Sequence, residues 1–592
     1  MCGIAGIMTA DGSPPSEPAL ERLADALAHR GPDGRGRHMA DGVGMVQTRL
    51  AIIDLETGDQ PIYAPAGAAD GAAIVANAEI YNYVELRADL AGAEFTTRSD
   101  CEPALHLYLR HGLDFTGLLR GMYAIAIHDR ARNRLVLARD PFGIKPLYYT
   151  ESASRFAFAS EPQALLKADL AARALRTESR DELFQLQFTC GRRTAFKGIQ
   201  RLLPGETIVV ERGHVVKRRR REALPDGAPE TWGAAEAGRR LEEALTDSVT
   251  VHQRSDVPYG MFLSGGVDSS ALLALMRELN DEPVHAFCAG FSAPGVADER
   301  DHARVVAEAA GARFEAVEFA EDDFWRLLPA VAAAMDDPAA DYALLPSYKL
   351  ARLAREAGLK VILTGEGGDE LFAGYGRYRR NARWRLFGGR PMRARGAFDG
   401  MDVLRTYPGN WRAGIGMAEV AENRPGRTRL QVAQAVDCTD WLPHDLLAKL
   451  DRCLMAHGVE GRTPFLDPRV AEVAFRLPDR LKARLGLGKW LLRSFVKRRL
   501  PSARPFSRKR GFTVPVAGWI AGRGRDLGPL VANQPGVREA CRPGAVEGLF
   551  AGSGKRQGRA AWNLLFFALW HRVHILGLAA EGDVFETLAS ET

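Results

Sequence analysis

The run from Phe262 to Ser270 contains two glycines, three serines and one acid, and it lies between two apolar stretches, 259–263 and 271–276. The first stretch is typical of a strand and the second of a helix, so the polar residues occupy a strand-to-helix turn. Such a turn binds anions, because glycines let the backbone approach the ligand and a helix N-terminus directs unpaired N–H groups at it. We therefore expect a phosphate chain to be bound by Ser264, Gly265, Gly266, Asp268, Ser269 and Ser270.

Asp268 distinguishes this turn from the loop of nucleotide triphosphatases, which is longer and carries a lysine before Ser or Thr. An acid beside phosphates is repulsive unless a divalent cation lies between them, so Asp268 implies Mg²⁺. The turn resembles the pyrophosphate loop of ATP pyrophosphatases, and the resemblance implies ATP cleavage between the α and β phosphates. The alternative is an ordinary serine-glycine turn in which Asp268 only starts the helix.

A second turn of this kind follows the apolar stretch 359–364, where Gly365 to Phe372 reads Gly-Glu-Gly-Gly-Asp-Glu-Leu-Phe. Strands that each lead into a helix belong to a parallel sheet, and ligands bind at the carboxyl ends of such strands. Asp268 and Asp369 can therefore share one magnesium that bridges phosphates. Alternatively, Asp369 only stabilises the dipole of the helix that it starts.

Cys2 is the most informative residue of the first two hundred. If Met1 is removed, Cys2 carries both a thiol and a free α-amino group. That amine titrates at about 7.7–8.0 and can accept the thiol proton, as in N-terminal nucleophiles. The alternative is a small buried residue in an edge strand.

Five further motifs accompany Cys2 in this half, namely His29–Gly34, Arg49–Asp54, Asn77–Asn82, Ser99–Glu102 and Arg139–Tyr148. Together they resemble the class II glutamine amidotransferase domain over about residues 1–210. The resemblance implies an N-terminal-nucleophile fold of α+β type, with two sheets between helical layers in αββα order. It also implies glutamine as the nitrogen donor.

The resemblance assigns a role to each polar residue of these motifs. Cys2 attacks the glutamine amide, and the Asn77 side chain and the N–H of Ala78 stabilise the oxyanion. Arg49 binds the substrate carboxylate, while Glu79 and Asp100 bind its α-ammonium. The family has glycine where this chain has Ala78, and a positive φ would be strained there.

Two motifs of the second half, Glu460–Asp467 and Gly488–Arg493, complete a resemblance to the synthetase domain of glutamine-dependent asparagine synthetases over about 257–519. The resemblance places Glu366 near the acyl-adenylate and the incoming ammonia, and Lys489 at the nucleotide phosphates. Both roles suit the chemistry, because a lysine stabilises developing phosphate charge and a carboxylate orients ammonia. Main-chain groups around Phe262, Ala289, Thr364 and Gly365 would hold adenine.

The stretch Asp336–Pro346 occupies the region that contacts the acid being amidated, and it lacks the small hydroxyl residues usual in asparagine makers. Aspartate is the leading substrate. A carboxylate of a secondary metabolite, a peptide or a glycan precursor is the alternative, since folds are reused for related chemistry.

A chain of 592 residues is too long to fold around a single hydrophobic core. We expect a glutaminase domain at 1–215, a linker at 216–232 and a doubly wound α/β nucleotide domain at 233–592. A net charge of +5 over this length is no nucleic-acid signature. The basic runs 217–221 and 377–395 read as solvated faces, with an anionic partner as the alternative.

Seven cysteines without a Cys-x-x-Cys pair indicate reduced thiols in a cytoplasmic protein. We expect no signal peptide and no membrane span, because the apolar tract 564–569 is short.

The elements that must position these residues follow from apolar periodicity. In the first half we expect strands at 1–7, 44–53, 72–76, 121–129, 134–138 and 206–210, and helices at 17–27, 84–91 and 102–111. In the second half we expect helices at 231–251 and 301–310 and strands at 259–263, 284–289 and 359–364.

These observations predict ATP-dependent, glutamine-hydrolysing amidation of a carboxylic acid through an acyl-adenylate. A ring-closing adenylating enzyme would have no use for Cys2 and Arg49. A sugar-phosphate amidotransferase would replace the turn at 264–270 with an isomerase module. A non-catalytic sensor would bind glutamine or nucleotide without turnover. The partners are small molecules, an apolar passage should carry ammonia between the sites, and the sequence leaves a homodimer open.

Overall fold

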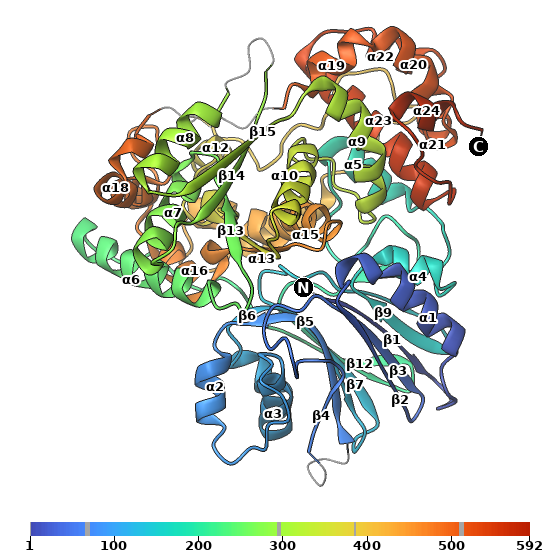
Figure 1. Ribbon diagram of the computed structural model, residues 1–592. Coiled ribbons are helices and arrows are strands. Elements are labelled where there is room, and N and C mark those ends of the chain that lie inside the picture. Colours follow the sequence, from blue (N-terminus) through green and yellow to red (C-terminus); the bar gives the residue numbers. More distant parts are fainter. Residues whose placement is uncertain are drawn as a thin grey trace.

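The computed structural model describes residues 2–65, 71–292, 298–383, 386, 388–507 and 514–591. Met1, and Arg385 of the basic run 377–395, lie outside these residues. The first part of the chain forms two stacked sheets with helices outside them, and the second part forms a parallel sheet covered by helices (Figure 1). Both fold classes expected from the sequence are confirmed.

The first sheet is antiparallel and carries Cys2 immediately before its central strand. Its order is β10 (Ile199–Arg201), β8 (Tyr148–Glu151), β9 (Arg155–Ala159), β1 (Gly3–Thr9), β3 (Val43–Arg49) and β2 (Gly34–Ala40). The helices α1 (Glu17–Ala26) and α4 (Pro162–Lys167) cover its outer face (Figure 1). Gly3 pairs with Thr48, so the register brings the start of β1 beside the end of β3.

The second sheet is also antiparallel and packs against the first. Its order is β12 (His214–Arg220), β11 (Glu206–Glu211), β7 (Arg134–Arg139), β6 (Gly121–Asp129), β5 (Ala73–Ile80) and β4 (Ile62–Tyr63). The helices α2 (Tyr83–Asp89) and α3 (Glu102–His111) form the outer layer on this side (Figure 1). Apolar side chains of both sheets, among them Ile4, Met45, Val75 and Leu137, fill the space between them.

Strand β12 contains residues that the sequence analysis places in the linker. It pairs with β11 along its length, from Glu206 opposite Arg220 to Glu211 opposite His214. The side chains of Lys217 to Arg220 are exposed on this edge strand and Arg221 is partly buried, so the solvated face expected for the first basic run is confirmed for four of its five residues. The domain limits given above stay a proposal.

Strand β3 ends at Arg49, four residues earlier than the apolar pattern 44–53 predicts. Leu50 and Ile52 leave the sheet and are buried in an apolar cluster together with Leu263 and Leu363 of the second half. Tertiary packing across the chain therefore overrides the local strand preference of this segment.

The parallel sheet forms the core of the second half. Its order is β15 (Arg313–Glu318), β14 (His285–Gly290), β13 (Tyr259–Phe262), β16 (Val361–Leu363) and β17 (Glu460–Arg462). Helices α7 (Val267–Leu279), α8 (Arg300–Ala309) and α18 (Trp490–Arg499) lie on one side, and α10 (Leu344–Glu356) and α15 (Leu447–Met455) on the other (Figure 1). This is the doubly wound arrangement expected from the alternation of strands and helices.

Strands β13 and β16 are neighbours, with Met261 paired to Leu363. Because they run in the same direction, the turns after them meet at the carboxyl edge of the sheet. A Cβ on Gly365 would come within 2.9 Å of the Asp268 Cβ, so the two turns are in contact. This close approach accounts for glycine at that position.

The remaining helices extend the second half. They include α6 (Ala234–His252), α9 (Glu321–Ala334), α11 (Gly368–Leu371), α12 (Gly376–Ala382), α13 (Ala413–Glu422), α14 (Arg429–Val436), α16 (Pro468–Arg476) and α17 (Asp479–Lys482). The C-terminal helices are α19 (Val516–Gly522), α20 (Gly524–Ala532), α21 (Pro535–Ala540), α22 (Ala545–Phe550), α23 (Lys555–His574) and α24 (Val584–Ala589), of which α23 is the longest. The tract 564–569 lies inside α23 and is buried, as expected. Within the described ranges, none of the helices combines the length and apolar character that a bilayer crossing requires. All seven cysteines are free and buried.

His574, at the end of α23, is a buried neutral histidine. Its Nε2 lies 3.1 Å from the carbonyl oxygen of Ala332, and since a carbonyl only accepts, Nε2 carries the proton. Burial lowers the pKa of His574 to about 4, compared with about 6.5 in an unfolded chain. Between these values the unfolded state binds a proton that the folded state does not. The stabilisation is therefore complete above the unfolded pKa and is lost as the pH falls towards the folded one.

We expect His574→Gln, which keeps an N–H donor, to lose less stability on acidification than the wild type. From about pH 7.5 to about pH 5, the difference in unfolding free energy between the two proteins should shift by about 2 kcal/mol in favour of the variant. Urea titrations at both pH values measure this shift. His214→Gln is the control, because the His214 side chain is 47% exposed. A difference that is the same at both pH values would contradict the prediction.

Candidate active sites

Cys2 lies beside Arg49 and Asn77, two residues singled out by separate motifs. Cys2 is 9% exposed, and its backbone N–H donates to Asn77 Oδ1 at 3.2 Å. Burial raises the pKa of the Cys2 thiol, and the nearby Arg49 guanidinium works in the opposite direction. If Met1 is removed, the nitrogen that now bonds Asn77 becomes the α-amine of Cys2.

The side-chain amide of Asn77 uses its oxygen in a hydrogen bond but not its nitrogen. Its Oδ1 accepts from Cys2, while its Nδ2 is fully buried and has no hydrogen-bond partner among the residues that the structure describes. A buried donor without a partner costs about 1–3 kcal/mol, which is unusual unless a ligand uses it. This geometry leaves an N–H donor next to the thiol, where an oxyanion would form.

Ala78 is the departure from glycine noted in the sequence. It lies in β5 opposite Tyr123 of β6, and it does not belong to the non-glycine residues with positive φ. Its methyl group therefore adds no backbone strain in this conformation. The backbone strain that the sequence analysis considered at position 78 is therefore absent.

Glu79 and Asp100, the two acids expected to bind an α-ammonium, are both buried. Asp100 Oδ2 accepts the N–H of Ile80 at 2.7 Å, and burial raises its pKa to about 6. Glu79 lies two residues after Asn77 on β5, and alternate residues of a strand share a face. Arg49 donates through Nη1 to Asp59 at 2.7 Å and through Nη2 to the carbonyl of Asp54. Asn77 and Arg49 thus lie near Cys2, and Glu79 and Asp100 lie near each other.

Arg30 is a part of this site to which the sequence analysis assigned no role. Its Nε donates to the carbonyl of Cys2 at 3.3 Å. Its Nη1 and Nη2 bond both carboxylate oxygens of Asp451, on α15 of the second half, at 2.7 and 2.9 Å. The backbone of Cys2 is therefore tied to the other half of the chain. Arg30 belongs to the motif 29–34, which was the available signal.

The serine-glycine turn after β13 has the expected form. Gly265 has a φ of +66°, a conformation that side chains disfavour, and the Gly266 N–H donates to Ser264 Oγ at 3.3 Å. Ser264 Oγ and Ser269 Oγ lie 3.3 Å apart. The two hydroxyl groups therefore lie together at the start of α7.

Asp268 and Asp369 lie on the same side of the molecule, held together by Lys489. Lys489 Nζ bonds Asp268 Oδ2 and lies 2.6 Å from Asp369 Oδ1. Burial lowers the pKa of Lys489, but the two carboxylates outweigh it and the net shift is upward. A Cβ on Gly374 would lie 1.8 Å from Asp369 Oδ1 and 2.4 Å from Lys489 Cε, so a side chain there would displace this pair. The juxtaposition predicted from the two turns is confirmed.

Glu366 lies next to a buried lysine that the sequence did not single out. Lys449 Nζ, on α15, is 3.5 Å from Glu366 Oε1 and 3.3 Å from Asp341 Oδ2. Burial raises the pKa of Glu366. The Glu366 side chain is 26% exposed, so it can reach a ligand.

Asp336 and Asp337 do not face this ligand region, although they belong to the expected acceptor stretch. Asp336 Oδ1 accepts from Arg452 Nε at 2.7 Å, and Asp337 accepts from Arg201 of the first half at 2.6 and 2.7 Å. Both acids are buried in contacts between the halves. Of the three acids in the stretch, Asp341 alone lies beside Glu366 through Lys449.

The main-chain positions expected to hold adenine share one edge. Phe262 and Ala289 lie at the ends of β13 and β14, and Thr364 and Gly365 follow β16. Since these strands are parallel neighbours, the four positions lie together with the serine-glycine turn.

The second basic run is only partly solvated, which corrects the expectation for it. Arg377 pairs with Asp437 at 2.6 Å, and its guanidinium lies 4.1 Å from the ring of Trp441. The guanidinium of Arg393 lies 4.7 Å from the same ring. Burial beside an aromatic ring and a carboxylate explains these two arginines better than solvation does.

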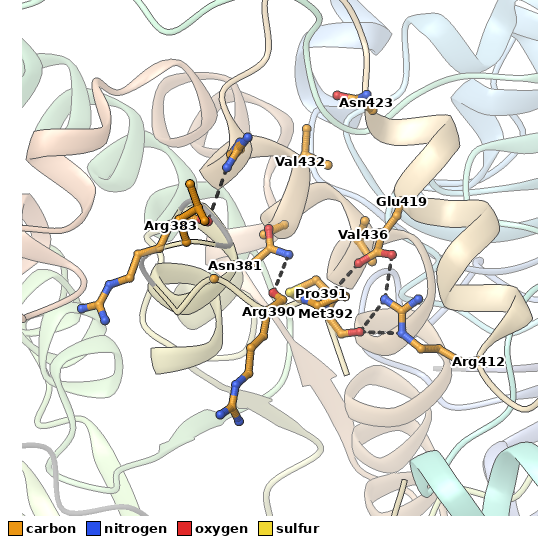
Figure 2. A pocket seen from close by; sticks show the side chains of 14 residues that line it. Asn381, Arg383, Arg390, Pro391, Met392, Arg412, Glu419, Asn423, Val432 and Val436 are labelled. Carbon is orange, nitrogen blue, oxygen red and sulfur yellow. Dashed lines mark hydrogen bonds and ion pairs between the residues drawn. The ribbon is translucent and has the colours of Figure 1, made fainter. Parts of the chain in front are cut away.

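A hollow of about 530 Å³ lies next to this run, between α13, α14 and the segment 381–392. Figure 2 shows the Arg412 guanidinium turned towards the Met392 carbonyl and the Glu419 carboxylate, which it bonds at 2.7 Å each. The hollow shares no lining residue with the Cys2 site or the Lys489 site.

Each half of the chain matches a protein-family model. Residues 1–220 match the model of the glutamine amidotransferase domain, and residues 240–572 match that of asparagine synthase. The chain is 30% identical to Bacillus subtilis asparagine synthetase [glutamine-hydrolyzing] 1 over 630 residues, covering 97% of each protein. It is 30% identical to asparagine synthetase 2 of the same organism, over 84% of this chain and 70% of that protein.

A further relative carries a different name. The amidase chry2 of Gibberella zeae is 28% identical over 82% of this chain and 84% of that protein. The family model covers more than half of the chain, and the Bacillus subtilis synthetase matches it nearly from end to end. The chain therefore belongs to the family of glutamine-hydrolysing asparagine synthetases.

Proposed function

We propose that the protein uses ATP to convert a carboxylic acid into an acyl-adenylate, and amidates it with ammonia that Cys2 releases from glutamine. One observation carries this proposal: a thiol beside a free buried amide donor and a lysine bridging two phosphate-turn acids occur in one chain, and the Arg30–Asp451 pair joins the thiol's surroundings to the second half. Either arrangement alone would support only one half of the reaction.

In the glutamine half, the Cys2 thiol attacks the side-chain amide after passing its proton to its own α-amine. Asn77 Nδ2 and the N–H of Ala78 stabilise the oxyanion, for which the buried donor is already in place. Arg49 binds the α-carboxylate, and Glu79 and Asp100 bind the α-ammonium. Collapse of the tetrahedral intermediate breaks the C–N bond, releases ammonia with the proton held by the α-amine and leaves a thioester on Cys2, which a water molecule then hydrolyses to glutamate and the free thiol.

In the ATP half, the backbone and hydroxyl donors of 264–270 hold the phosphates. Asp268 and Asp369 suit Mg²⁺, because that ion takes one or two carboxylates and completes its shell with phosphates and water. Their position around Lys489, with no side chain at Gly374, supports this fit. Bound there, Mg²⁺ would neutralise phosphate charge. Lys489 stabilises the charge that develops as the carboxylate attacks the α-phosphate.

Ammonia must then reach the adenylate as the free base. Glu366 orients it and takes up the surplus proton, and Lys449 beside it keeps that carboxylate in place. We propose an apolar route between the sites. Support comes from the buried cluster in which Leu50, Ile52 and Ile144 of the first half pack with Leu363 and Leu446 of the second.

Aspartate is the acceptor that we place first, as in the relatives named asparagine synthetase. Lys449 can bind its α-carboxylate and Asp341 its α-ammonium. The second candidate is another carboxylate, and two observations favour it. Ala339 and Ala340 are buried and offer no hydroxyl groups, and one relative is named as an amidase.

The test is to incubate the enzyme with ATP, Mg²⁺, glutamine and each member of a panel of carboxylic acids, and to measure AMP, pyrophosphate and glutamate. The proposal expects one acid to raise AMP and pyrophosphate in equal amounts, with one glutamate per amide. ADP and phosphate as products would exclude an adenylate. A sensor would bind glutamine or ATP without forming any of these products.

A further inference from the structure

An arginine of the second half contacts the proposed glutamine site of the first half. Arg462 is the last residue of β17 and is fully buried. Its Nη2 lies 2.9 Å from Glu79 Oε2, across the interface between the halves. Glu79 is the carboxylate to which the proposed function assigns the α-ammonium of glutamine.

Three bonds within its own half hold the Arg462 guanidinium. Its Nε donates to Glu460 Oε1 at 2.7 Å, and its Nη1 donates to the carbonyls of His252 and Arg254 at 2.9 and 2.7 Å. A guanidinium is planar, so fixing two of its nitrogens fixes the third. Nη2 is therefore presented to Glu79 in one orientation.

The charges around Glu79 make this contact consequential. Burial, Glu460 and Asp100 together raise the pKa of Glu79 well above its ordinary value, although Arg462 works in the opposite direction. Lys145 lies 4.0 Å from Glu460. Arg462 is thus the cation in direct contact with the acid that must stay ionised to bind an ammonium group.

The backbone of Arg462 reaches the other site. Its carbonyl accepts the N–H of Thr364 at 2.8 Å, and β17 pairs with β16 with Leu363 opposite Arg462. Thr364 begins the turn that carries Glu366. One residue therefore contacts the Glu79 carboxylate with its side chain and the turn that carries Glu366 with its main chain.

We propose that Arg462 is a positioning residue for the glutamine half-reaction, supplied by the synthetase half: it pairs with Glu79 and fixes that carboxylate for the α-ammonium of glutamine. The proposal rests on the role of Glu79 in the proposed function. It makes glutamine affinity depend on the interface, because the first half alone lacks the Arg462 guanidinium that contacts Glu79.

The experiment compares Arg462→Gln, Arg462→Lys, Glu79→Gln and the double variant Arg462→Gln/Glu79→Gln in glutaminase assays. Arg462→Gln should raise KM for glutamine about tenfold or more, as expected for loss of a buried charge contact, with a much smaller change in kcat. The double variant should be no worse than the poorer single variant, since both changes remove one interaction. Amide formation from ammonium salts reports folding, and the exposed Arg469→Gln is the matched control.

The pH profile separates positioning from a structural role. Without the guanidinium, Glu79 protonates at higher pH, so KM for glutamine should rise more steeply on acidification in Arg462→Gln than in the wild type. Arg462→Lys keeps the charge but not the planar fork, so it should restore the wild-type profile only in part. It also serves if Arg462→Gln does not fold.

The outcomes distinguish this inference from the proposed function. If Glu79→Gln leaves KM for glutamine unchanged, the assignment of Glu79 in the proposed function is wrong. If Glu79→Gln raises KM but neither Arg462 variant does, that assignment stands and the role of Arg462 is refuted. Additive effects in the double variant would also refute it.

Discussion

Replacing Cys2 by alanine will abolish amide formation from glutamine and leave amide formation from ammonium salts. Loss of the nucleophile removes the covalent step entirely, so glutamate release should fall on the order of 10³-fold or more. The adenylate site is untouched, since Lys489, Asp268 and Asp369 lie in the other half. External ammonia can replace the missing donor at high concentration.

The measurement is paired for each variant: glutamate release with glutamine as donor, and AMP formation with ammonium chloride as donor. Cys541→Ala is the control, because Cys541 is also a free, buried thiol but lies beside the C-terminal helices. It should retain both activities. Glutamine use that survives in Cys2→Ala would mean that another residue is the nucleophile.

Asp268→Asn and Asp369→Asn should produce the opposite pattern. Each change removes a negative charge that a divalent cation needs, and it also breaks the pairing with Lys489. We expect AMP and pyrophosphate formation to fall on the order of 10²-fold or more, a loss typical of removing one element of charge stabilisation. Glutamine hydrolysis should continue, because the Cys2 site contains neither residue.

Asp301→Asn provides the matched control for these variants. Asp301 lies in the first turn of α8 as Asp268 lies in the first turn of α7, and it is exposed. If Asp268 mattered only for the helix dipole, the two changes would have similar small effects. A loss of glutamine hydrolysis as large as the loss of AMP formation would contradict independent sites.

Local patterns in the sequence were sufficient for most elements. The strand at 121–129 and the helix at 102–111 match the structure residue for residue, because a clear apolar period is bounded by turn residues at both ends. The two glycine turns were correctly placed on one edge, since parallel strands leave little freedom. Asn77, Arg49 and Cys2 were brought together as expected from motif order.

These patterns could not predict the long-range charge contacts. Arg462 and Arg30 sit inside recognised motifs, yet nothing in a linear motif says that each one reaches across to the other half. Asp337 belongs to the stretch that was expected to contact the acceptor acid. It binds Arg201 instead, which lies 136 positions earlier in the sequence. Such pairs depend on how the two halves pack against each other. This packing produces no periodic pattern in the sequence of either half.

Strand β17 ends the parallel sheet, and its residues Glu460 and Arg462 contact the first half. A fragment produced from about residue 233 onwards would leave these two side chains without their partners in the first half, on the edge strand of the sheet. An uncovered strand edge is a template for pairing with other molecules, so we expect such a fragment to aggregate. Separate expression of the two halves is therefore a poor route to the isolated synthetase reaction, and point variants in the whole chain are the better one.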